Sequence, residues 1–132
     1  MIQVPFSSPP PRPQWRVDLS AWILDHSVAP QPPPQLTGTE QARLEKLIDP
    51  VKRTNLERSY RTVRAGLSEH LGCQSADIII EHDDLGAPFL SSYPDLCLSI
   101  SRTEGWSAFA LSPDAAIGID IERVRSIDWH QM

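Results

Sequence analysis

Residues 49–72, with the sequence DPVKRTNLERSYRTVRAGLSEHLG, carry the strongest structural signal in the chain. Pro50 stands where a helix can begin and Gly72 where one can end, so the stretch predicts a helix from near Lys52 to Leu71. At about 100° per residue, five apolar side chains of this helix fall on one stripe that should face the core. They are Leu56, Tyr60, Val63, Leu67 and Leu71.

The arginines of this helix differ in their position relative to the apolar stripe. Arg58 and Arg61 lie well outside it and are expected to be solvated. Arg53 and Arg64 lie at its edge, where a long side chain can lay its stem on the core and extend its charge over a neighbouring cleft. Arg53 and Arg64 are therefore the better candidates for ligand contact.

Upstream of this helix, the sequence predicts a strand and a shorter helix. Apolar and polar side chains alternate over residues 15–23, which predicts a strand with Ala21 and Ile23 on its buried face and Trp22 on the other. Thr37 and Glu40 have the spacing of a capping box, which predicts a first helix over residues 39–48.

Downstream, the pattern changes to short strands separated by turn residues. The expected strands are residues 78–81, 96–101, 106–111 and 117–122. Helices packed on one side of a largely antiparallel sheet make an α+β fold. Residues 1–13 include a proline-rich stretch and are interpreted as an arm outside that fold, because proline removes a donor and fixes its dihedral angle.

Composition limits the class of protein. The chain has 132 residues, of which 40% are hydrophobic and 22% charged, so we expect one domain or one lobe of a larger one. No apolar run approaches the roughly 20 residues that span a bilayer, and the first 13 residues lack the apolar stretch of a secretory signal, so a cytoplasmic location is expected and a membrane partner is not. Cys73 and Cys97 have no zinc-site spacing.

Charge is unevenly distributed along the chain. The net charge of -5 argues against nucleic acid as a partner. However, seven of the twelve Lys and Arg residues fall between Arg43 and Arg64. Such a local basic bias is suited to a phosphorylated small molecule.

Residues 118–122, Gly-Ile-Asp-Ile-Glu, are the sharpest candidate for chemistry. In a strand, Asp120 and Glu122 point to the same face about 6.6 Å apart and can reach one cation. Two carboxylates, completed by phosphate oxygens and waters, suit Mg²⁺. An isolated Asp-x-Glu is more often a pair of solvated acids on an ordinary strand, so the spacing alone does not establish a metal site.

The motif belongs to an ordered series of four. In chain order, these are residues 86–88 (Gly-Ala-Pro), 98–103 (Leu-Ser-Ile-Ser-Arg-Thr), 106–110 (Trp-Ser-Ala-Phe-Ala) and 117–122 (Ile-Gly-Ile-Asp-Ile-Glu). The series resembles the amino-terminal lobe of surfactin-type 4'-phosphopantetheinyl transferases. That lobe carries a Gly-Lys-Pro turn, a Ser-Ile-Ser-His-Ser-like strand end and a Gly-Ile-Asp-Ile-Glu strand in the same order. The helix with Arg53 and Arg64 is similar to the family's basic helix, and the resemblance covers about residues 15–127, within an expected lobe of residues 14–132.

The resemblance implies an activity and a set of site residues. Such enzymes transfer the 4'-phosphopantetheine arm of coenzyme A, as substrate, to a serine of an acyl or peptidyl carrier protein, and a cation stabilises charge on the diphosphate. It implies that Asp120 and Glu122 bind Mg²⁺. The implied coenzyme A-binding residues are Arg53, Arg64, Gly86, Pro88, Ser101 and Arg102, and no catalytic residue is assigned.

Three departures from the family bear on catalysis. Ala87 replaces the lysine of the Gly-Lys-Pro turn and supplies no side-chain donor. Arg102 replaces a histidine, so it can bind phosphate but cannot act as a neutral acid or base. The family's second lobe, with its Trp-x-x-Lys-Glu-like helix, has no counterpart, so we expect the chain to be an amino-terminal half that is incomplete alone. The order of motifs also differs from the short trimeric holo-acyl carrier protein synthases, in which the Asp-x-Glu strand comes near the amino terminus.

Two other interpretations remain open at this stage. In one, the chain is a degenerate lobe that binds a partner or nucleotide without chemistry, which Ala87 and Arg102 favour. In the other, it is an unrelated α+β interaction domain whose motifs match by chance. If the chain is a lobe, we expect it to associate with a second lobe or as a homodimer through an apolar face around residues 117–121.

Overall fold

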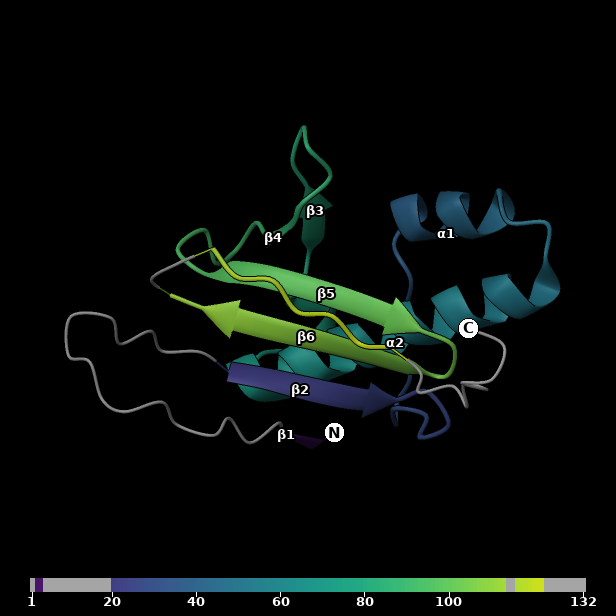
Figure 1. The fold of residues 1–132 in the computed structure, drawn as a ribbon, viewed down its shortest axis with the longest axis horizontal. Coiled ribbons are helices and arrows are strands. Elements are labelled where there is room, and N and C mark those ends of the chain that lie inside the picture. The colour runs from purple at the N-terminus through teal and green to yellow at the C-terminus, as the bar shows by residue number, and fades with distance from the viewer. Residues whose placement is uncertain (1, 4–19, 114–115, 123–132) are drawn as a thin grey trace, which may run out of the picture.

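The computed structural model describes residues 2–3, 20–113 and 116–122 and has the mixed α+β architecture expected from the sequence (Figure 1). The proline-rich stretch of residues 7–13 and the first part of the predicted strand, residues 15–19, lie outside the described residues. The elements in chain order are β1 (Ile2–Gln3), β2 (Ser20–Asp25), α1 (Gly38–Glu45), α2 (Pro50–Leu71), a short 3-10 helix (Ser75–Asp77), β3 (Ile80–His82), β4 (Pro88–Leu90), β5 (Cys97–Thr103) and β6 (Trp106–Ser112).

The strands form two antiparallel sheets. The larger sheet has the order β1-β2-β6-β5, and every neighbouring pair in it is antiparallel. The smaller sheet is the β3–β4 hairpin, which projects beside the larger sheet in Figure 1. This arrangement confirms the prediction of a largely antiparallel fold. Among the described helices, none combines the length and the apolar character needed to cross a membrane.

Local signals define both helices. The N-cap of α2 is Asp49, whose carboxylate accepts a hydrogen bond from the Val51 amide at 2.9 Å, and the helix ends at Gly72 with a φ of 69°. Only glycine adopts this left-handed conformation without strain. The helix thus begins two residues before the predicted start at Lys52.

The predicted capping box of α1 is confirmed by reciprocal bonds between Thr37 and Glu40. Helix α1 ends at Glu45, three residues before the expected end. The reason lies in the next helix, because Asp49 precedes a proline and is biased toward extended backbone, as an N-cap requires.

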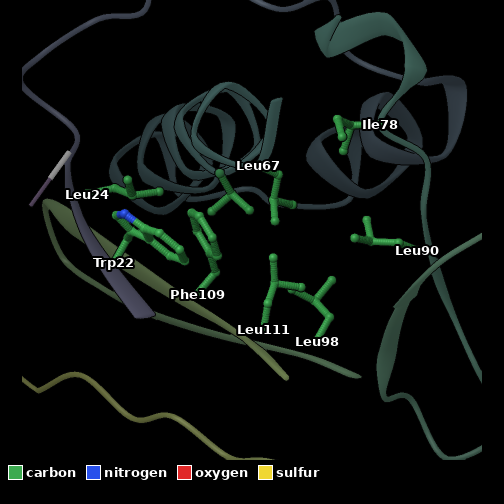
Figure 2. Close-up of a cluster of buried hydrophobic side chains, with 9 residues drawn as sticks. Trp22, Leu24, Leu67, Ile78, Leu90, Leu98, Phe109 and Leu111 are labelled. Carbon is green, nitrogen blue, oxygen red and sulfur yellow. The ribbon is translucent and has the colours of Figure 1, made fainter. Parts of the chain in front are cut away.

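The core lies between α2 and one face of the larger sheet (Figure 2). The middle of the predicted stripe is confirmed, since Tyr60, Val63 and Leu67 are buried. The buried apolar cluster consists of Trp22, Leu24, Val63, Leu67, Ile78, Leu90, Leu98, Phe109 and Leu111.

The predicted face assignment of β2 was wrong. Trp22 and Leu24 point into the core against α2, whereas Ala21 lies on the opposite face and is also fully buried. Because both faces of this strand are covered, the alternation of side chains could not identify the face that meets the helix. The bulky Trp22 lies on the side that faces α2, where it stacks on Phe109 with ring centroids 5.0 Å apart.

Residues 117–122, which were predicted to form a strand, do not pair as a strand of either sheet in the structure. In Figure 1 this yellow segment crosses in front of β5 and β6, on the side of the sheet opposite α2. The amides of Ile119 and Ile121 donate to the hydroxyls of Ser99 and Ser101, both at 3.0 Å. These bonds to side chains, rather than to strand carbonyls, hold the segment parallel to β5 without extending the sheet.

Candidate functional site

The two acids of the Asp-x-Glu motif are exposed on the outer side of the 116–122 segment. Asp120 and Glu122 alternate with the half-buried Ile119 and Ile121. One carboxylate oxygen of Asp120 accepts a hydrogen bond from Ser101 Oγ at 3.1 Å. Because Ser101 Oγ already accepts from the Ile121 amide, its single proton is directed to Asp120.

The donor chemistry of this pair fits a hard cation only in part. Carboxylate oxygens suit Mg²⁺, and both acids are accessible. Across residues 2–3, 20–113 and 116–122, however, no group of three or more His, Cys, Asp or Glu side chains is placed to hold a metal ion. Asp120 and Glu122 can therefore supply two ligands, and the rest of a coordination shell would come from a substrate or a partner.

Arg102 lies on the other face of β5 from Ser101, so these two neighbouring candidates do not face the same space. The Nε of Arg102 donates to Ser59 Oγ of α2 at 2.7 Å. The guanidinium carbon lies 5.4 Å from the centroid of the Tyr60 ring. A cation packed on an aromatic face and fixed through Nε presents its terminal nitrogens in one direction.

Three basic side chains come from three elements, and the charges of two of them lower the pKa of the third. They are Arg43 of α1, His82 of β3 and Arg102 of β5, and we call them the basic cluster. Partial burial lowers the pKa of His82, and the charges of Arg43 and Arg102 lower it further, while Asp83 raises it. Desolvation also lowers the pKa of Arg102, while Tyr60 raises it, Arg43 lowers it further and Glu40 raises it. Mutual repulsion of this kind is relieved by a bound anion.

Two members of the basic cluster, Arg43 and His82, were not predicted as site residues. Arg43 falls within the basic stretch between Arg43 and Arg64, but no pattern separates it from the other cations there. His82 directly follows the predicted strand at residues 78–81 and lies next to the turn that contains Gly86. Its proximity to Arg102 depends on the packing of the β3–β4 hairpin beside β5, which local sequence does not encode.

Gly86 and Pro88 belong to that hairpin. Gly86 has a φ of 84° in an exposed turn, where the Asp83 carboxylate accepts from the amides of Leu85 and Ala87, both at 2.9 Å. Pro88 pairs with His82 in the β3–β4 register. The turn therefore has a complete structural explanation, and His82 lies directly beside it, in the last residue pair of the hairpin before the turn.

Arg64 and Arg53, the two arginines expected to contact a ligand, bond to the chain itself. The side chain of Arg64 is buried and forms an ion pair with Glu40 at 2.8 Å. Its other nitrogens donate to the carbonyls of Ile78 and Gln35. The exposed Arg53 donates through Nε and Nη2 to the Leu47 carbonyl, where it closes the loop between α1 and α2.

Arg61 was expected to be solvated but is half-buried. It forms an ion pair with Glu57 at 3.1 Å and donates to the Pro34 carbonyl. The helical wheel failed for Arg64 and Arg61 because other segments, residues 34–40 above all, cover that side of α2.

A buried chain of hydrogen bonds continues from Arg102 to His26. Ser59 Oγ lies 2.7 Å from Ser107 Oγ, which lies 2.7 Å from His26 Nε2, and His26 Nδ1 lies 2.9 Å from Asn55 Oδ1. Burial lowers the pKa of His26, which favours its neutral form. Among the described cavities, one of about 520 Å³ lies between β2 and α2 and is lined by none of the predicted site residues.

Comparison with known proteins adds no assignment. No protein-family model matches the chain, and no curated protein sequence matches it. Function must therefore be argued from the motifs, the basic cluster and the acidic pair.

Proposed function

We propose that this chain is the amino-terminal lobe of a surfactin-type 4'-phosphopantetheinyl transferase and binds the phosphates of coenzyme A at the basic cluster. The observation that supports this most directly is the placement of Arg102, which is held through Nε by Ser59 and packs on the Tyr60 ring. The charges of Arg43 and Arg102 both lower the pKa of His82, so cations of three elements act on one region. Asp83 and Glu40 offset part of the repulsion among these cations, and a bound polyphosphate would offset more of it through charge-assisted hydrogen bonds. Coenzyme A carries a diphosphate and a 3'-phosphate, which give it several such groups.

The residues assigned in this proposal lie on opposite sides of β5, Arg102 on the side of α2 and the acidic pair on the other. A carrier-protein serine attacks the diphosphate of coenzyme A, its hydroxyl proton passes to a base, and 3',5'-ADP leaves. In this scheme the basic cluster binds and orients phosphate oxygens, and Arg102 can do so with two nitrogens. Asp120 and Glu122 would hold Mg²⁺, which stabilises charge on the diphosphate when bound. The hydroxyl of Ser101 donates to one carboxylate oxygen of Asp120 and so orients this carboxylate.

The structural contacts narrow the set of ligand-binding residues in this proposal. Arg64 is committed to Glu40 and two carbonyls, so we assign it a role in stability. Arg43 and His82 take its place beside Arg102. Completion of the active site is assigned to a second lobe, or to a homodimer partner, together with the carrier protein, because the described residues provide two acids for the cation and no assigned base.

A non-catalytic lobe that binds a nucleotide is the second candidate. The specific observation in its favour is the turn at residues 83–87, where Ala87 offers only its backbone amide, already bonded to Asp83. In that case the basic cluster would still bind phosphates. The two candidates differ in whether the acidic pair has a function.

Calorimetric titration with coenzyme A tests the binding part of the proposal. Arg43→Ala and Arg102→Ala should each weaken binding about tenfold or more, because each removes charge-assisted hydrogen bonds to phosphate. Lys52→Ala, which removes an exposed positive charge from the start of α2, is the matched control and should change affinity less than twofold. Equal affinity for the wild type and Arg102→Ala would exclude the basic cluster as the phosphate site.

A carrier-protein mass assay distinguishes the two candidates. With coenzyme A and Mg²⁺, the chain alone should not modify a carrier protein, whereas the chain with a family second lobe should do so. Asp120→Asn should abolish that transfer while leaving coenzyme A binding in the absence of metal unchanged. Phosphate binding without transfer under any of these conditions would support the non-catalytic lobe.

A further inference from the structure

Ser59 holds a position in the structure that its sequence context did not suggest. It is fully buried in α2, and its hydroxyl accepts the Nε–H of Arg102 at 2.7 Å across to β5. Arginine has no acceptor, so the direction of this bond is fixed. Ser59 is thus the contact that joins the arginine of the basic cluster to the core.

The other protons in this series of hydrogen bonds can be assigned by starting from Asn55, at the end opposite Arg102. The amide group of Asn55 is oriented by two backbone contacts, because its Nδ2 donates to Thr103 O and its Oδ1 accepts from Gly105 N. His26 Nδ1 must therefore donate to Asn55 Oδ1, which leaves Nε2 of the neutral ring as an acceptor. It follows that Ser107 donates to His26 and Ser59 donates to Ser107.

This assignment fixes the orientation of the Ser59 hydroxyl. Its only proton points to Ser107, so a lone pair is directed at Arg102 Nε. With Nε bonded and the guanidinium packed on Tyr60, rotation of the Arg102 side chain is restricted. Among the residues that the structure describes, Nη1 and Nη2 of Arg102 have no hydrogen-bond partner and remain available to an anion.

We infer that Ser59 is a positioning residue for anion binding: it holds Arg102 through Nε so that its two terminal nitrogens are kept in place for a phosphate. The inference rests on the proposed function, since it assumes that the basic cluster binds phosphate. A side chain fixed before binding loses less conformational freedom when the ligand arrives. Loss of the Ser59 hydroxyl should therefore reduce affinity even though Ser59 never touches the ligand.

Ser107 provides a matched control within the same chain of hydrogen bonds. Ser59 and Ser107 are both fully buried, and each loses one hydroxyl on substitution by alanine. Ser59→Ala removes the acceptor of Arg102 Nε, whereas Ser107→Ala keeps that acceptor and removes only the group that accepts its proton. If the hydroxyls act only through stability, both substitutions should have the same effect on binding.

The test is calorimetric titration of the full chain with inorganic pyrophosphate, alongside thermal unfolding of each variant. We expect Ser59→Ala to raise the dissociation constant about fivefold to tenfold, Ser107→Ala less than twofold, and the two to lower the unfolding temperature similarly. In the Arg102→Ala background, Ser59→Ala should have no further effect on affinity, which a double-mutant cycle measures. Ser59→Cys, which keeps a similar volume but is a weak acceptor, should change affinity in the same direction if Ser59→Ala folds poorly.

The outcomes separate this inference from the proposed function. If pyrophosphate binding does not depend on Arg102, the proposed phosphate site is wrong. If binding depends on Arg102 but Ser59→Ala and Ser107→Ala have equal effects, the positioning role is wrong and the phosphate site stands. The positioning role would also be wrong if Ser59→Ala still weakened binding in the Arg102→Ala background.

Discussion

Replacement of Arg64 by methionine tests whether this arginine stabilises the fold or binds a ligand. The side chains of Arg64 and Glu40 are 3% and 11% exposed, so the substitution leaves a carboxylate unpaired in a poorly solvated place. It also removes the donors to the Ile78 and Gln35 carbonyls. Removing one partner of such a buried pair costs about 3 to 5 kcal/mol, a large part of the roughly 5 to 15 kcal/mol that stabilises an ordinary domain.

The expected shift in unfolding temperature follows from the size of the chain. With an unfolding entropy of about 2.1 cal/mol/K per residue, a chain of 132 residues loses roughly 4 °C for each kcal/mol. Arg64→Met should therefore lower the unfolding temperature by about 12 to 20 °C. Thermal unfolding followed by far-ultraviolet circular dichroism measures this shift.

Two further variants identify the ion pair as the cause. Glu40→Gln keeps an acceptor for the Thr37 amide in the capping box and removes only the charge, so the double variant Glu40→Gln, Arg64→Met should recover part of the loss. Arg61→Met breaks a partly exposed pair on the same helix and should cost about 1 kcal/mol or less.

One pattern of results would contradict the structural role of Arg64. If Arg64→Met unfolds at the same temperature as Arg61→Met but loses affinity for coenzyme A as Arg102→Ala does, Arg64 contacts the ligand. The assignment from the sequence would then be correct after all.

Two other measurements test the protonation states in the structure. Burial lowers the pKa of His26 below its unfolded value of about 6.5. Between the folded and the unfolded pKa, the unfolded chain therefore binds more protons than the folded chain. Stability should fall as the pH decreases through about 6.5. Urea midpoints at pH 5 and pH 7.5 should show this loss, and His26→Gln should reduce it; an identical pH dependence in the variant would contradict the assignment. For His82, bound pyrophosphate should offset the charges of Arg43 and Arg102 and raise its pKa, which proton NMR of the imidazole measures. An unchanged or lowered pKa of His82 would show that the anion binds elsewhere.

Several features of this protein follow from local sequence. Asp49, Pro50 and Gly72 define the ends of α2, and Thr37 with Glu40 defines the start of α1, because each of these signals acts between residues no more than four positions apart. The middle of the buried stripe on α2 and the strands β5 and β6 could also be predicted, since periodicity and turn residues are local signals.

The structure was needed wherever a contact joins segments distant in sequence. Periodicity could not show that Arg64 is covered by residues 34–40, nor that Trp22 rather than Ala21 meets α2, because it records the pattern of one element and not what packs against it. The Asp-x-Glu motif was visible in the sequence, yet its attachment to β5 through Ser99 and Ser101 depends on side chains about 20 positions away. In the same way, the nearness of Arg43, His82 and Arg102 depends on how α1, the β3–β4 hairpin and β5 are arranged around the core, which none of these segments determines alone.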